Sequence, residues 1–124
     1  MAKTIAQVRK GLYRRTMAIP DELVEEVTRR FALLADPTRL RILRLLLEQE
    51  EATVSELAEE VGGTAANVSQ HLSRLLSGGV VARRRHGRTV RYSIADPSIH
   101  ALCDLVCRAL MEPRRRFPVG PSRR

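Results

Sequence analysis

A chain of 124 residues, 44% of them hydrophobic, can form one domain with a modest core, and this composition excludes an intrinsically disordered protein. Only 3% of the residues are aromatic, so aliphatic side chains must fill the core. No apolar run reaches the roughly 18 residues of a membrane span, and we expect no membrane partner. Two cysteines are too few for a disulfide framework, which favours the reducing cytoplasm.

The net charge of +8 is unevenly distributed along the chain. Of the 14 acidic residues, 11 lie between Asp21 and Glu60. From Val61 to Ala95 there is no acid, whereas six arginines and two histidines occur there. This distribution is typical of a surface that binds a polyanion such as nucleic acid, the alternative being a solvated basic face.

The first part of the chain predicts a basic arm and two helices. Residues 1–19 form the arm, which either contacts DNA or has no fixed structure. A helix begins at Pro20 and Asp21, and its apolar residues recur at helical spacing: Leu23, Val27, Phe31 and Leu34. Asp36 and Pro37 suit the start of a second helix. Its apolar residues predict a central, largely buried helix: Leu40, Ile42, Leu43, Leu45, Leu46 and Leu47.

Two short helices joined by a glycine turn follow. The first, "TVSELAEEVGG", has the capping-box pair Thr53 and Glu56 and ends at two glycines. The second, "TAANVSQHLSRLLSGG", begins after Thr64 and ends at another glycine pair. Its apolar positions predict one buried face: Val68, Leu72 and Leu75.

The remaining elements are a hairpin, a last helix and a tail. Two β-prone runs flank His86-Gly87, which predicts a β-hairpin. A last helix is expected over residues 97–111, and the basic tail 113–124 is expected to be disordered. The sequence thus predicts a mainly α fold with a small β-hairpin, with residues 20–112 as the DNA-binding and dimerisation domain.

A helix-turn-helix followed by a basic hairpin forms a winged helix-turn-helix, whose second helix fits the major groove. Asn67 and Gln70 suit adenine edges, and Arg74 suits a phosphate or a guanine. His71 either satisfies a backbone group or contacts DNA. Strand alternation places Arg84 on the opposite face from its neighbours. The candidate DNA contacts are Thr64, Ala65, Ala66, Asn67, Ser69, Gln70, Ser73, Arg74, Arg83, Arg85, His86, Arg88 and Arg91.

Three segments together resemble the ArsR/SmtB family of bacterial transcriptional regulators: "LADPTRLRILRLL", "TVSELAEEVGGTAANVSQHLSRLLSGGVV" and "RRRHGRTVRYSI". The resemblance runs from about residue 22 to 112. It implies a homodimeric winged helix-turn-helix repressor that binds double-stranded operator DNA. The first and last helices would form the dimer interface, and inducers, commonly metal ions, would release the DNA.

Two inducer sites familiar from this family are incomplete here. One uses a Cys-x-Cys pattern where this chain reads "TVSELAEE", without cysteine or histidine. The other uses two histidines and two acids on the last helix. Asp96 and Glu112 match its acids, but Ser98 and Ala109 stand at the histidine positions. Two carboxylates are too few donors for a zinc ion.

The stretch "HALCDLVC" is the remaining sensor candidate, because His100, Cys103 and Cys107 share one helical stripe with Asp96. Two thiols one turn apart could chelate a soft metal ion or trivalent arsenic, completed by His100 or by a cysteine of a partner subunit. The thiols could instead be oxidised or persulfidated. They could also be inert, because they border an apolar stripe and free cysteine packs as a small hydrophobe.

The sequence favours a DNA-binding repressor, with or without a small-molecule inducer. A winged-helix module that binds proteins is the alternative, although the acid-free basic segment argues against it. An enzyme is not expected. The sequence has no nucleophile–base pair, no Gly-rich phosphate loop and no paired catalytic carboxylates.

Overall fold

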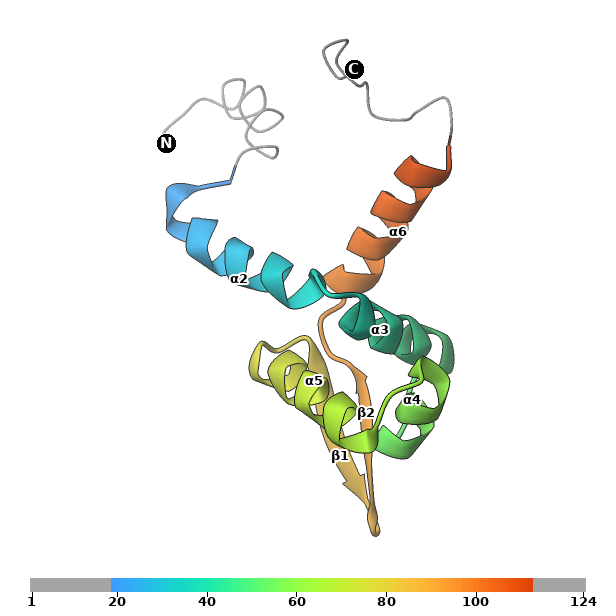
Figure 1. Cartoon of the computed structure of the whole chain (residues 1–124). Coiled ribbons are helices and arrows are strands. Elements are labelled where there is room, and N and C mark those ends of the chain that lie inside the picture. Colours follow the sequence, from blue (N-terminus) through green and yellow to red (C-terminus); the bar gives the residue numbers. More distant parts are fainter. Residues whose placement is uncertain (1–18, 113–124) are drawn as a thin grey trace. The chain divides into compact units, whose positions relative to one another are not determined.

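The computed structural model describes residues 19–112, and the chain divides into two units, Met1–Asp36 and Pro37–Arg124. The first unit contains a 3-10 helix, η1 (Asp21–Leu23), and α2 (Val24–Leu34). The second contains α3 (Pro37–Gln49), α4 (Val54–Val61), α5 (Ala65–Ser77), β1 (Val81–His86), β2 (Thr89–Ile94) and α6 (Ser98–Met111) (Figure 1). A mainly helical fold with one hairpin is thereby confirmed. The expected arm, up to residue 18, and the tail 113–124 lie outside the described residues.

The predicted first helix is present, with a 3-10 turn at its start. Its apolar face, however, is mostly exposed rather than buried. Leu34 is buried, but Phe31 is 51% exposed and Leu23 is 48% exposed. The described part of the first unit contains no second element long enough to cover this face.

Helix α3 is the centre of the second unit, as predicted. Ile42, Leu43, Leu45 and Leu46 are at most 6% exposed, and α3 packs against α4, α5 and β2. Leu40 was expected on this face but is 41% exposed. Its side chain points away from the buried centre because it lies about 160° around the helix from Ile42.

Both ends of α4 follow the predicted capping pattern. The Thr53 hydroxyl accepts a hydrogen bond from the Glu56 N–H at 3.2 Å, and the Glu56 carboxylate accepts one from the Thr53 N–H at 2.9 Å. Gly62 ends α4 in the left-handed region, with φ of 75°. These local interactions fix the tight turn between α4 and α5.

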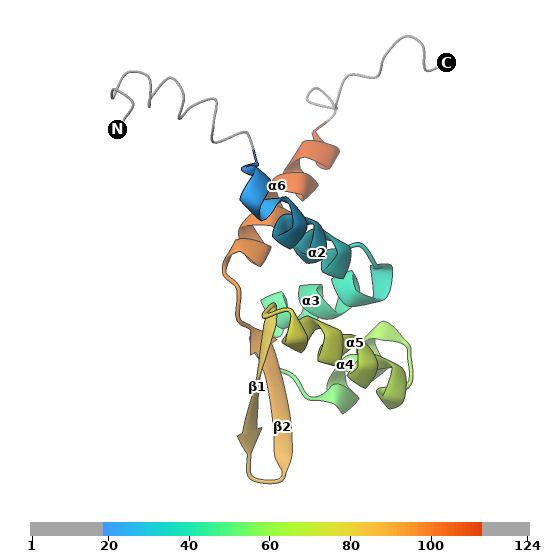
Figure 2. The ribbon, with the colours of Figure 1, turned by 90° about the vertical axis from the view of Figure 1, so that its left-hand side faces the viewer.

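Strands β1 and β2 pair antiparallel, with Val81 opposite Ile94 and His86 opposite Thr89. Gly87 has φ of 69°, a left-handed conformation that a two-residue hairpin turn requires at its first position. Figures 1 and 2 show the hairpin turn projecting beyond α4 and α5. No helix among residues 19–112 is long and apolar enough to cross a bilayer.

The buried face of α5 can be tested by substitution. Leu72 is completely buried, so Leu72→Ala should lower the free energy of unfolding by about 2–5 kcal/mol, through lost burial and a cavity. The neighbouring Ser73 is exposed, and Ser73→Ala should change it by less than about 0.5 kcal/mol. Chemical denaturation at one fixed protein concentration measures both. Equal effects would contradict the assignment of the buried face.

Candidate nucleic-acid interface

Helix α5 has one buried face and one exposed polar face. Val68, Leu72 and Leu75 are completely buried, as predicted. The candidate contacts from the second helix are all exposed: Thr64, Ala65, Ala66, Asn67, Ser69, Gln70, Ser73 and Arg74. The three aliphatic anchors therefore turn the short polar side chains outward, which is the geometry a helix needs to meet base edges in a major groove.

The N-terminus of α5 is fixed by Thr64, whose hydroxyl accepts a hydrogen bond from the Asn67 N–H at 3.0 Å. Thr64 thus serves as the helix cap that the sequence predicted. Ala65 and Ala66 follow it and keep the first turn narrow. A narrow, rigid first turn allows close approach to a groove floor.

His71 lies at the edge of the buried face of α5 and is half-buried. Its Nδ1 is 3.1 Å from Nη1 of Arg39, which belongs to α3. A cross-helix contact of this kind fixes the rotation of α5 about its axis. From the sequence, His71 was expected to bind a backbone group or to contact DNA. Its contact with Arg39 was not predicted.

The candidate wing contacts lie on two different faces of the hairpin. Arg83 is opposite Tyr92, and Arg84 is opposite Arg91. Because side chains alternate along a strand, Arg83 and Arg85 lie on one face and Arg84 on the other, as expected from the sequence. The face of Arg83 and Arg85 is also that of the buried Tyr92. His86 and Arg88 are exposed at the turn.

The opposite face of the hairpin contains two ion pairs with acids of the helical region. The Arg84 guanidinium donates to both carboxylate oxygens of Glu51, at 2.9 and 2.8 Å. Arg91 lies 3.9 Å from Glu56. The hydrogen bond from Arg84 is the main cause that lowers the pKa of the Glu51 carboxyl, and the charges of Arg84, Arg91 and His86 act in the same direction.

The pairing of Glu51 with Arg84 was missed by sequence reasoning because the two residues are 33 positions apart. The only indication in the sequence was the alternation of side chains along the strand, which placed Arg84 on the opposite face from the candidate wing contacts Arg83 and Arg85. Choosing its acidic partner requires knowing that the loop between α3 and α4 runs beside β2. The backbone of Ala52 pairs with that of Tyr92 there, with N···O distances of 3.1 and 2.8 Å.

The sensor candidate lies on α6. His100 and Cys107 are exposed, and Cys103 is half-buried. Asp96 instead stabilises the start of the helix, because its Oδ1 accepts hydrogen bonds from the N–H and hydroxyl of Ser98. Within residues 19–112 of one chain, no three histidine, cysteine or acidic side chains are grouped so that they could hold a metal ion.

The environment of the Cys103 thiol limits its chemistry. Burial, with the nearby Cys107 thiol, raises the pKa of the Cys103 thiol. A reactive cysteine normally has a lowered pKa, because the thiolate is the nucleophile. This environment therefore disfavours spontaneous oxidation of Cys103 more than binding of a thiophilic ion, which itself displaces the proton.

Comparisons with known proteins agree with this geometry. A helix-turn-helix domain family matches residues 34–84. A homodimeric winged helix-turn-helix DNA-binding domain from Mycobacterium bovis, described as a "possible ArsR-family transcriptional regulator", is 31% identical, with a TM-score of 0.67 over 81% of this chain and 93% of that one. The antimony-specific transcriptional repressor AntR is 30% identical, with a TM-score of 0.70 over 80% and 89%.

The chain belongs to the ArsR/SmtB family of winged helix-turn-helix transcriptional regulators. Among curated relatives, this ArsR/SmtB protein is 40% identical over 84 residues to the "Probable mercury resistance operon repressor" of Streptomyces lividans. That match covers 68% of this chain and just under two thirds, 66%, of the relative. The family consists of DNA-binding regulators rather than enzymes.

Proposed function

We propose that this protein is a sequence-specific repressor that binds operator DNA as a homodimer in the cytoplasm. The observation that carries the proposal is the polar outer face of α5 beside a wing rich in arginine, in a segment without acids from residue 61 to 95. Gln70 and Asn67 would read base edges in the major groove. Arg74, Arg83, Arg85, His86 and Arg88 would contact phosphates or the adjacent minor groove.

Homodimerisation is supported by the exposed apolar side chains on α2 and α6. Phe31 on α2 is 51% exposed, while Val106 and Leu110 on α6 are 45% and 65% exposed. Such side chains normally lie in an interface when they recur along one side of a helix. We infer that both helices pack against a second copy of the protein. This packing would set the distance between the two copies of α5, the reading helix that would contact the DNA bases.

We further propose that the inducer is a thiophilic ion bound by Cys103 and Cys107. Both cysteines border the stripe formed by Leu102, Val106 and Leu110, so dimerisation through that stripe would bring thiols of two subunits near each other. Donors from the second copy would complete a ligand set that residues 19–112 of one chain do not form. The names of two relatives, a mercury resistance operon repressor and an antimony-specific repressor, support this choice of ion class.

DNA binding is tested by fluorescence anisotropy on a duplex from the protein's own promoter, over a range of salt concentrations. Arg88→Ala should weaken binding to all duplexes and reduce the slope of log K against log salt by about 0.9 per subunit, because one phosphate contact is lost. Gln70→Ala should instead lower the preference for the operator by about 1–3 kcal/mol.

Arg44→Ala is the matched control for these two variants. Arg44 is exposed on α3, outside the candidate interface, and should leave both readouts unchanged. If the unmodified protein binds no duplex at any salt concentration, the repressor proposal is wrong and the protein-interaction module is favoured.

The dimer interface is tested with Leu110→Glu, which places a charge in the apolar stripe of α6. We expect sedimentation velocity to show a shift from dimer to monomer, because the carboxylate would have to be buried in the interface. Ala101→Glu adds the same charge on the opposite, exposed side of α6 and should leave the dimer intact. An unchanged dimer in both variants would exclude this stripe as the interface.

The inducer is tested by titrating the reduced, DNA-bound protein with arsenite. Release of DNA should require both thiols, so Cys103→Ser and Cys107→Ser should each abolish the response without changing DNA affinity in the absence of arsenite. Binding that is indifferent to arsenite would exclude arsenic as the signal. The same titration with Cd(II) then decides whether another soft ion acts at these thiols.

A further inference from the structure

The arginines of the wing have two different surroundings. Arg84 and Arg91 face each other across the hairpin and share the face opposite the buried Tyr92. Two like charges directly opposite each other destabilise an antiparallel pair. Their neutralisation must therefore come from a third element, and the structure provides one.

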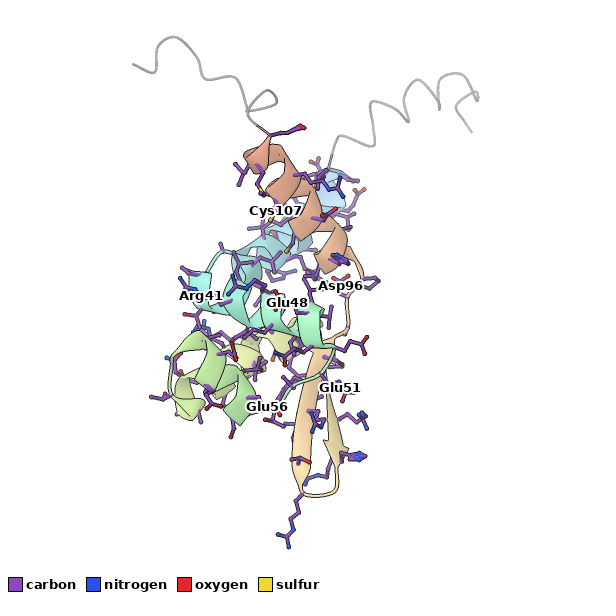
Figure 3. The ribbon with its side chains drawn as sticks, turned by 90° about the vertical axis from the view of Figure 1, so that its right-hand side faces the viewer. Arg41, Glu48, Glu51, Glu56, Asp96 and Cys107 are labelled. Atoms are coloured by element: carbon purple, nitrogen blue, oxygen red, sulfur yellow. The ribbon has the colours of Figure 1, made fainter. Side chains whose placement is uncertain are left out.

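That element is the connection between α3 and α4 together with the first turn of α4. Glu51 binds Arg84 through both carboxylate oxygens, and Glu56 lies 3.9 Å from Arg91. Figure 3 shows both glutamates beside the hairpin. Two arginines and two glutamates form a cluster without net charge. Arg88, at the turn of the wing, differs from them because it is exposed and its neighbours in the sequence, Gly87 and Thr89, are uncharged.

The backbone guides this contact. Glu50 ends α3 with φ of 73°, a left-handed conformation that costs a residue with a side chain about 1–2 kcal/mol. The turn sends the next residues along β2, where Ala52 forms its two backbone hydrogen bonds with Tyr92. Ala52 is buried, so the neighbouring Glu51 points to the other face of this small sheet, toward Arg84.

We propose that the pair of Glu51 and Arg84 is a clasp that fixes the angle of the wing relative to the reading helix α5, and that Arg84 is a positioning residue rather than a phosphate contact. An exposed ion pair contributes little to global stability. The expected effect of this pair is therefore on the orientation of the hairpin. One nitrogen of Arg84, Nη2, donates to both carboxylate oxygens of Glu51, and hydrogen bonds between two charged groups are stronger than those between neutral groups. The inference rests on the proposed DNA binding, because the wing needs an angle only if it contacts a duplex.

The test compares Glu51→Gln with Glu50→Gln, which removes the same charge one residue away. Both variants remove one negative charge from the same loop, but only Glu51→Gln removes a partner of Arg84. Only Glu51→Gln should lower the ratio of operator affinity to scrambled-duplex affinity, by about threefold to fivefold. Arg84→Gln should lower this ratio similarly while leaving the salt slope unchanged, and the exchange of both residues, Glu51→Arg with Arg84→Glu, should restore it.

A second readout does not need DNA. Amide hydrogen exchange of the free protein should be faster at Ala52 and Tyr92 in Glu51→Gln than in Glu50→Gln, because the clasp holds this backbone pair closed. If wild type binds no DNA but exchange differs, the proposed function is wrong and the clasp is real. If Arg84→Gln lowers the salt slope by about 0.9 per subunit and the exchange rates are equal, Arg84 is a phosphate contact and the inference is overturned.

Discussion

The burial of three aliphatic side chains on α5 is the constraint on which the proposed interface depends. Val68, Leu72 and Leu75 are completely enclosed, so α5 cannot rotate without opening the core. The polar side chains of Ser69, Gln70, Ser73 and Arg74 are then directed outward by the helical period. Thr64 at the cap and Arg39 against His71 add polar contacts that fix the same orientation. The reading surface is therefore a consequence of core packing.

The separation of charge along the chain becomes a separation in space through the same fold. Acids are absent from α5 and the hairpin but present in α4 and in the loop before it. The loop lies beside the hairpin, and its Glu51 forms an ion pair with Arg84 there. The other face and the turn keep their positive charge. The six arginines of the acid-free segment 61–95 thus give positive charge to the surface where a polyanion would be bound, and their charge is cancelled where the hairpin lies beside the loop.

The sequence was sufficient for the local part of this structure and insufficient for the rest. The capping box at Thr53, the glycine turns and the buried face of α5 depend on spacing within one or two turns, and they were predicted correctly. The buried face of α3 was also predicted, except for Leu40, which is exposed. The pairing of Glu51 with Arg84 depends on a loop conformation set by Glu50 and by the bridge to Tyr92, which no periodicity encodes. The exposure of Phe31 shows the same limit, because an apolar face in a sequence does not state whether its cover comes from the same chain or from a second copy.

Backbone hydrogen bonds through Val80 connect the base of α6 to the end of α5. Val80 follows α5 after two glycines, and its N–H donates to the carbonyl of Leu75 within α5. The carbonyl of Val80 accepts hydrogen bonds from the N–H groups of Ala95 and Asp96, at 2.9 and 3.3 Å. Asp96 in turn holds the first turn of α6 through Ser98.

One residue thus joins the end of the reading helix to the base of α6, and it is completely buried. Movement of α6 cannot be absorbed by a long flexible linker, because only residues 95–97 separate β2 from α6. A ligand that prefers one orientation of α6 shifts the equilibrium between the orientations of α6 by its difference in affinity for them. The path from the base of α6 to the end of α5 is short, because it passes through the single buried residue Val80.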